Sequence, residues 1–146
     1  MQLINVLTTS ILLAGGVIAE HPSATSGTTP SEGGKIPLHV VKVSNKNGDL
    51  AFTPNVIQAN KGDMVQFQFY PKKHSVVQST FDQPCQPIEM NMPAVKGFFS
   101  GFMPVKPTDT MLPSYTIMVK NASMPMWFYC SQGKHCQSGM VGVINP

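Results

Sequence analysis

The stretch that decides the fold runs from Met126 to Ile144 and reads MWFYCSQGKHCQSGMVGVI. It opens and closes with short apolar runs, Met126–Tyr129 and Met140–Ile144, whose lengths suit buried β-strands better than a helix. Residues 131–139 between them are mostly polar and include two glycines, which is typical of a tight loop. The stretch therefore predicts two core strands joined by a loop at one end of a β-structure.

Six earlier segments have the β-branched composition or the alternation of short strands. In the clearest of them, Asp63–Tyr70, the side chains of Val65, Phe67 and Phe69 fall on one face. The dipeptide Asn47-Gly48 predicts a tight turn. Strands are expected at 38–43, 50–52, 56–57, 63–70, 74–78 and 114–119. This pattern predicts one all-β domain, either a Greek-key β-sandwich or a closed Greek-key barrel.

One long segment, Phe81–Pro113, interrupts the succession of strands and is called the proline-rich segment below. Its prolines, at positions 84, 87, 93, 104, 107 and 113, exclude a long helix or strand over most of it. We expect a long irregular loop with room for a short helical turn. Its apolar residues are expected to tuck against the end of the sandwich, namely Phe98, Phe99, Phe102 and Met103.

The N-terminal part of the chain predicts export. Residues 1–19 have the apolar stretch and the small terminal residues of a cleavable signal peptide, and polar interruptions disfavour a membrane anchor. Residues 20–36 are rich in Ser, Thr, Gly and Pro, which predicts a flexible lead-in. The folded domain is expected at 37–146, with no hydrophobic tail for a lipid anchor. We expect a secreted monomer with no transmembrane segment in its mature form, and association with the cell wall stays open.

Charge and export together narrow the partners and modifications. Charged residues make up only 12% of the chain, and the net charge of +3 includes ten lysines but no arginine. Nucleic-acid recognition uses arginine forks as well as charge, so nucleic acid is not an expected partner. In an exported protein, Asn121-Ala122-Ser123 is an acceptor for N-glycosylation, with Asn121 as the modified residue.

The same C-terminal stretch carries the chemistry. Cys130, His135 and Met140 follow one another at intervals of five residues, and His74 begins the predicted strand at 74–78. Two imidazoles, a thiolate and a weak thioether are the donor set of a blue-copper electron-transfer site. Thiolate and thioether suit Cu(I) while imidazole suits both oxidation states, so this set predicts one copper ion that changes charge with little rearrangement.

The number of cysteines is consistent with this hypothesis. The chain has three, and a disulfide uses them in pairs. If Cys130 supplies the metal thiolate, Cys85 and Cys136 remain to form a bridge. Such a bridge would tie the proline-rich segment to the loop that carries His135.

The run from Trp127 to Val141 resembles the ligand loop of cupredoxins, with a spacing similar to that of phytocyanins. Phe69-Tyr70-Pro71, His74-Ser75-Val76 and Ser100-Gly101-Phe102 are similar to phrases of small secreted fungal cupredoxin-domain proteins. The resemblance covers about Leu38 to Pro146. It implies an eight-stranded Greek-key fold and a disulfide corresponding to Cys85–Cys136. It also implies a type 1 copper held by His74, Cys130, His135 and Met140.

Other chemistries fit the same residues less well. Structural zinc does not recruit Met, a Cys–His hydrolase would need an orienting Asn or Asp, and a multicopper oxidase would need more than four histidines. We therefore expect a single-electron carrier and not an enzyme. The alternatives are a copper acquisition or buffering protein and a cell-wall interaction module that retains the site. The expected partner is an extracellular redox protein or a copper donor or acceptor.

Secondary candidates lie around the predicted site. Lys72 and Lys73 are expected to be solvated charges that could steer an acidic partner. His21 and His39 are expected to be ordinary polar residues. Several methionines are candidates for an exposed rim that hands over Cu(I), although Met also fills gaps in cores; these are Met90, Met92, Met103, Met124 and Met126.

Overall fold

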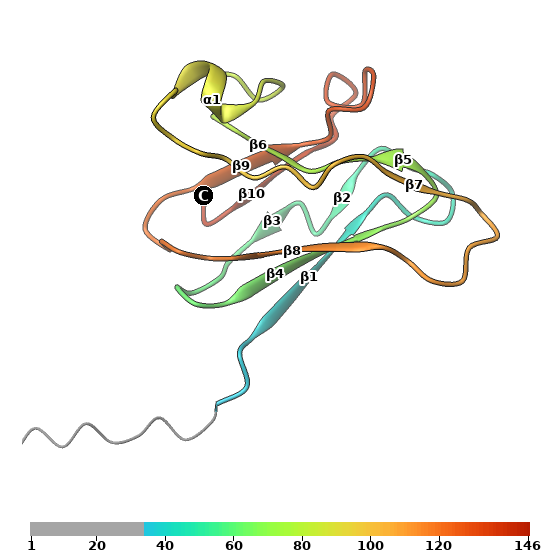
Figure 1. Cartoon of the computed structure of the whole chain (residues 1–146), viewed down its shortest axis with the longest axis horizontal. Helices are drawn as coiled ribbons and strands as arrows, with labels where there is room; N and C mark the ends of the chain where they lie inside the picture. Colours follow the sequence, from blue (N-terminus) through green and yellow to red (C-terminus); the bar gives the residue numbers. More distant parts are fainter. Residues whose placement is uncertain (1–33) are drawn as a thin grey trace, which may run out of the picture. The chain divides into compact units, whose positions relative to one another are not determined.

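The computed structural model describes residues 34–146, which form one compact unit. The predicted signal peptide at 1–19 and most of the lead-in at 20–36 lie outside the described residues. The described chain contains ten strands and one short helix (Figure 1). The elements are β1 (Leu38–Val43), β2 (Phe52–Thr53), β3 (Val56–Ile57), β4 (Met64–Phe69), β5 (Lys72–His74), β6 (Val77–Ser79), α1 (Ile88–Asn91), β7 (Met103–Val105), β8 (Ser114–Met118), β9 (Met126–Tyr129) and β10 (Val141–Ile144).

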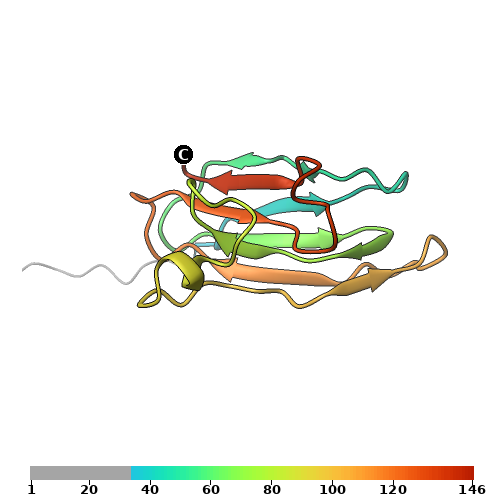
Figure 2. The ribbon, with the colours of Figure 1, turned by 90° about the horizontal axis from the view of Figure 1, so that it is seen from above.

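The strands form two four-stranded sheets that face each other. One has the order β2-β1-β4-β8 and the other β3-β10-β9-β6, while β5 and β7 make a separate two-stranded ribbon. Within the sheets, β1 pairs with β4 and β3 with β10 in parallel, and the other neighbours are antiparallel. Figure 2 shows the strands of both layers lying along nearly the same axis, as in aligned sandwiches. Of the two predicted architectures, the described residues form the sandwich and not a closed barrel.

Alternation in β4 explains how the first sheet faces the core. Val65, Phe67 and Phe69 are fully buried, whereas Met64, Gln66 and Gln68 on the other face are only half-buried. Tyr115 and Ile117 of β8 lie opposite Phe67 and Val65 and pack against the same core. The predicted face of this strand is confirmed, and its period of two follows from the pleat.

Aromatic side chains from both sheets meet in the centre. The Phe128 ring makes edge-on contacts with Phe52 at 4.9 Å and with Phe67 at 5.2 Å between ring centroids. Gly142 on β10 leaves room for the Phe128 ring, because a Cβ there would overlap that ring. The strands that flank the predicted site loop are thus held rigidly by the core.

The proline-rich segment contains more structure than predicted. The short helical turn is present as α1, but β7, which pairs with β5, was not predicted. Phe98 and Met103 pack against the core as expected. The prediction was wrong for Phe99 and Phe102, which are 52% and 45% exposed. Those two rings contact each other edge-on, and the Lys73 ammonium lies over Phe102, so they find partners outside the core.

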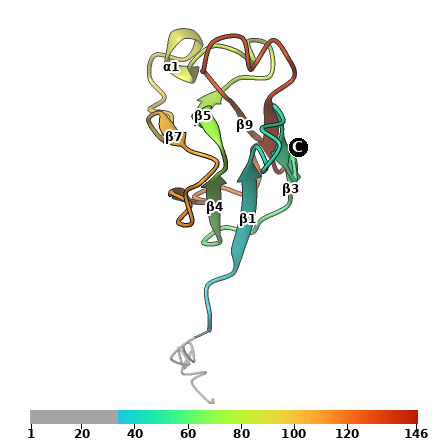
Figure 3. The ribbon, with the colours of Figure 1, turned by 90° about the vertical axis from the view of Figure 1, so that its right-hand side faces the viewer.

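The helix α1 and the loop between β9 and β10 lie on one side of the second sheet. Figures 1 and 3 place α1 and the loop of residues 130–140 on the outer side of the layer that contains β9. That loop, called the ligand loop below, joins β9 to β10 as predicted. The fold therefore brings the end of β5 and the ligand loop to the same end of the sandwich.

Candidate metal centre

Four predicted site residues lie at strand ends or in the ligand loop. His74 is the last residue of β5, Cys130 directly follows β9, and Met140 directly precedes β10. His135 lies midway along the loop between Cys130 and Met140. Residues 56 positions apart in the chain, His74 and Cys130, are thus brought together by the fold.

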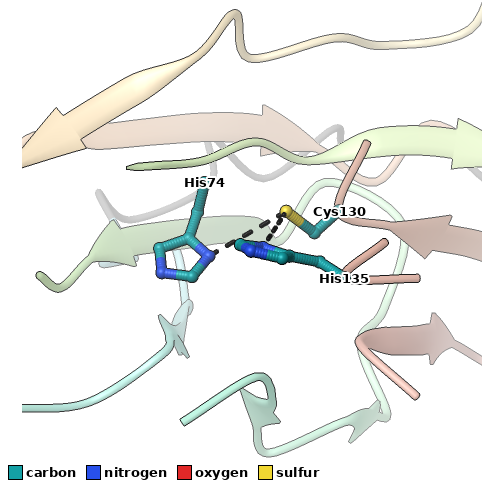
Figure 4. A group of neighbouring side chains, drawn as sticks. All are labelled: His74, Cys130 and His135. Atoms are coloured by element: carbon teal, nitrogen blue, oxygen red, sulfur yellow. Dashed lines mark hydrogen bonds between the residues drawn. The ribbon is translucent and has the colours of Figure 1, made fainter. Parts of the chain in front are cut away.

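The two imidazoles face the sulfur of Cys130 (Figure 4). Its Sγ lies 3.4 Å from Nδ1 of His135 and 3.9 Å from Nδ1 of His74. One ligand atom from each of the three residues lies within 4.8 Å of the others. Three soft or borderline donors therefore converge on one point, and no carboxylate belongs to this cluster in the described part of the chain.

His74 is fixed by a second contact. Its Nε2 lies 3.1 Å from the carbonyl oxygen of Pro71, and the side chain is fully buried. A carbonyl only accepts hydrogen bonds, so Nε2 carries the proton and Nδ1 keeps its lone pair toward Cys130. Such an outer contact sets both the tautomer and the ring orientation of a metal-binding histidine.

Cys130 is buried, forms no disulfide, and receives a hydrogen bond from the backbone. The Ser75 amide donates to its Sγ over 3.4 Å. The Ser75 hydroxyl accepts from the Ser131 amide at 2.9 Å and lies 2.8 Å from the Ser131 hydroxyl. Ser75 therefore links the segment after His74 to the ligand loop. Sequence analysis did not assign this role, and its position next to His74 was the available signal.

The backbone of the ligand loop closes on itself beside Met140. The Met140 amide donates to the His135 carbonyl at 3.0 Å, and the Cys130 amide donates to the Met140 carbonyl at 3.1 Å. The Met140 side chain is fully buried and belongs to the same core cluster as Cys130. Backbone hydrogen bonds thus connect Met140, the predicted thioether ligand, with both His135 and Cys130.

Burial favours the neutral form of both imidazoles. Burial lowers the pKa of His74, the Pro71 carbonyl partly opposes this, and the charges of His135 and Lys72 lower the pKa further. Burial is also the main cause that lowers the pKa of His135, followed by the charge of Lys72. Neutral imidazole is the form that binds a metal ion.

The predicted disulfide is present. Cys85 and Cys136 are bonded, with their Cα atoms 5.7 Å apart. The bridge joins the proline-rich segment to the residue directly after His135. The two bridged cysteines pack with Val77, Tyr129 and Val141 in a small apolar cluster that is separate from the main core.

The other predicted residues lie elsewhere. His39 contacts the Asp63 carboxylate at 2.8 Å, which agrees with its prediction as an ordinary polar residue. His21 lies outside the described residues. Asn121 is exposed in the turn between β8 and β9, and its Oδ1 accepts a hydrogen bond from the Ser123 amide.

The chain is similar in sequence to two known proteins. No protein-family model matches the chain. The chain is 37% identical over 101 residues to the "Probable GPI-anchored cupredoxin-1" of Arthroderma benhamiae, covering 69% of this chain and 47% of the relative. It is 35% identical over 98 residues to an "Extracellular serine-rich protein" of the same organism, covering 67% of this chain and 36% of the relative. The chain thus spans less than half the length of these curated relatives.

Solved structures share the fold. The "Novel Purple Cupredoxin from Nitrosopumilus maritimus" aligns with a TM-score of 0.52 and 14% identity, covering 73% of this chain and 96% of that one. At this identity the likeness concerns the fold alone. Across residues 34–146, no helix has the length and apolar character needed to cross a membrane.

Proposed function

On the premise that this chain is a cupredoxin-domain protein, we propose that it binds one copper ion and transfers single electrons. His74, Cys130, His135 and Met140 would hold the ion in a type 1 site. The observation that carries this proposal is the convergence of two Nδ1 atoms on one buried, unpaired sulfur. A cation between the three atoms would interact with both nitrogens and the sulfur at once, which a single thiol proton cannot do, so the arrangement suits a bound ion.

The chemistry of the donors favours copper over other metals. The cluster offers two imidazoles and one thiol with a buried methionine adjacent in the backbone, and it contains no carboxylate among the described residues. Hard cations prefer oxygen ligands, and structural zinc prefers four Cys or His ligands. A His₂Cys set with a weak thioether is the combination typical of blue copper. Copper, when bound, supplies a one-electron couple.

The protein's own residues hold the donors still. Pro71 orients His74, and the Ser75 amide hydrogen-bonds the sulfur. The Ser75–Ser131 contact joins the two ligand-bearing segments. Such support keeps the donor positions the same in both oxidation states, which lowers the cost of rearrangement during transfer.

His135 is the proposed exit for the electron. His74, Cys130 and Met140 are fully buried, whereas His135 is partly exposed. A redox partner would therefore dock over the His135 edge. Lys72, Lys73 and Lys134 are exposed lysines from β5 and the ligand loop, so an acidic partner would associate faster at low ionic strength.

A copper titration tests the proposal. Adding Cu(II) to the metal-free protein should give one equivalent of an intensely coloured complex with narrow copper hyperfine splitting. Cys130→Ser should abolish the colour while leaving the β-sheet circular dichroism intact. His39→Gln, which removes a histidine outside the cluster, serves as the matched control and should keep the colour. A colourless complex in the unmodified protein would refute the type 1 site.

Copper acquisition is the second candidate. Met90, Met92 and Met124 are 68%, 44% and 59% exposed, and thioethers bind Cu(I). Electron self-exchange separates the two roles. Fast exchange supports the electron carrier, while slow exchange combined with ready transfer of Cu(I) to a chelator supports acquisition.

We also propose that the protein is secreted, with residues 1–19 removed. The Cys85–Cys136 disulfide supports an oxidising compartment. The names of the two relatives, one GPI-anchored and one extracellular, point the same way. N-terminal sequencing of protein from the culture medium should find a start near Glu20, and an intact Met1 would contradict cleavage.

A further inference from the structure

A second surface feature lies at the other end of β9 from Cys130. A groove of about 340 Å³ runs between α1, the end of β6 and the turn before β9. Figure 1 shows these elements on the same side of the molecule. Phe81, Trp127, Met92, Met124 and Asn121 are among the residues that line it, and it is called the Asn121 groove below.

The walls of this groove leave large apolar side chains in contact with water. Phe81 is 68% exposed, and its ring centroid lies 5.0 Å from that of the half-buried Trp127. Met92 and Met124 are also exposed. A cluster of exposed apolar side chains in a chain with few charges marks a surface that something covers.

The candidate cover is attached to the rim. Asn121 belongs to the sequence Asn121-Ala122-Ser123, which is an N-glycosylation acceptor. The side chain is exposed, and the Ser123 amide hydrogen-bonds its Oδ1. This contact occupies the oxygen of the carboxamide and not Nδ2, the atom to which a glycan is joined. A sugar on Nδ2 would therefore start at the mouth of the groove.

We propose that Asn121 carries an N-linked glycan whose first N-acetylglucosamine residue lies in the Asn121 groove against Phe81 and Trp127. The inference rests on the proposed secretion. Nδ2 attacks C1 of a lipid-linked pyrophosphoryl oligosaccharide; the C1–N bond forms, the C1–O bond to phosphate breaks, and the amide releases one proton. The lipid pyrophosphate is the leaving group.

The chemistry of the two surfaces is complementary. The flat faces of a pyranose ring consist of C–H groups, and its N-acetyl group ends in a methyl, so both can cover aromatic rings. The sugar hydroxyls point outward and keep their hydrogen bonds to water. Because the sugar is tethered at the rim, its local concentration is high and weak contacts are enough to hold it.

Trp127 gives a direct readout because it is the single tryptophan of the chain. The full chain is produced in a secreting eukaryotic host, and mass spectrometry determines the occupancy of Asn121. Acrylamide quenching of Trp127 fluorescence is then compared between the glycosylated protein and Ser123→Ala, which lacks the acceptor sequence but keeps Asn121. The quenching constant should be about two-fold lower with the glycan, because one side of a half-exposed ring is covered.

Three further variants and trimming of the glycan make the result specific. Ser123→Thr keeps the acceptor sequence and should keep the protection. Trimming the glycan to one N-acetylglucosamine should also keep most of it. A glycan packed in the groove should also raise the thermal stability of the protein. Phe81→Ala should remove most of that increase, whereas Met111→Ala, at an 86% exposed residue outside the groove lining, should not.

The outcomes are separable from those of the copper proposal, since quenching is measured on the metal-free protein and repeated with copper. An unoccupied Asn121 in the secreted protein overturns the inference and leaves the copper spectrum unaffected. Equal quenching with and without the glycan overturns it as well. Protection that needs the outer branches and vanishes on trimming also counts against it, because it indicates general shielding in place of packing in the groove.

Discussion

The ligand loop and the proline-rich segment are joined by one disulfide but are held in place differently. In the ligand loop most backbone contacts are local: the amides of His135, Gly139 and Met140 donate to carbonyls of Gln132, Cys136 and His135. The proline-rich segment depends more on distant strands. The Phe98 carbonyl accepts from Gln78 on β6, and β7 pairs with β5.

This difference has a physical consequence for the metal centre. A short loop closed by its own hydrogen bonds keeps its shape whenever its two flanking strands are in place. A long segment whose local hydrogen bonds close only separate short turns has a larger entropy to lose and depends on each distant contact. We therefore expect perturbations of the proline-rich segment to change stability far more than they change the geometry at Cys130.

Removing the disulfide is the strongest test of that comparison. In Cys85→Ser/Cys136→Ser, the unfolded chain gains the freedom of a loop with a sequence separation of 51, and the free energy of unfolding should fall by about 4 kcal/mol. Denaturant unfolding measures the loss. The charge-transfer spectrum of the copper-loaded variant should stay close to that of the parent below its unfolding transition.

The opposite pattern would break the comparison. If the spectrum changes strongly while stability falls little, the bridge holds His135 in place and the ligand loop is not self-supporting. The single variant Cys85→Ser is not an adequate substitute, because it leaves a free thiol at Cys136 directly beside His135.

The same contrast explains what the sequence could predict. The spacing of Cys130, His135 and Met140 lies within one loop, so residue types and intervals sufficed to propose them together. His74 required the fold, and it was placed by resemblance and strand pattern. The structure brings it to the sulfur, although as the end of β5 and not the start of a strand.

Contacts between distant segments were beyond reach. Neither the pairing of β5 with β7 nor the role of Ser75 follows from local composition, because both depend on which segments the sandwich brings side by side. Phe99 and Phe102 show the same limit. A hydrophobic side chain predicts burial, but these two rings stay at the surface, where they contact each other and Phe102 contacts Lys73.

A smaller effect is expected where the two ligand-bearing segments touch. Ser75→Ala keeps the hydrogen bond from the backbone amide of residue 75 to the Cys130 sulfur. It removes the hydroxyl that accepts a hydrogen bond from the Ser131 amide. The free energy of unfolding should fall by about 1–2 kcal/mol, since a partly buried donor loses its partner. The copper spectrum should shift modestly, because the Ser75–Ser131 contact no longer holds the ligand loop to the segment after His74.

Ser138→Ala is the matched control for this change. Its hydroxyl donates to the Lys134 carbonyl within the ligand loop, is exposed, and forms no hydrogen bond with the segment after His74. Stability and spectrum should both remain near the parent. Equal effects of the two serine variants would mean that the link between the segments contributes nothing specific.

The smallest effect is expected from a group outside both loops. Asp63 directly precedes β4, at the end of that strand away from His74, and its carboxylate contacts His39 and the Asn60 amide. The hydrogen bond from His39, then that from Asn60, hold the pKa of Asp63 below its ordinary value. A lowered folded-state pKa means that this contribution to stability is complete above the unfolded value of about 4 and is lost as the pH falls through the folded value.

Asp63→Asn should therefore lower stability slightly at neutral pH and flatten its decline below about pH 4. Asp82→Asn, at an exposed position in the proline-rich segment, should leave that decline unchanged. Denaturant melts at a series of pH values compare the variants. Because Asp63 supports the sandwich itself, its loss should weaken the ligand loop and the proline-rich segment together. Hydrogen exchange that speeds up in only one of them would show that the two are not supported by a common core.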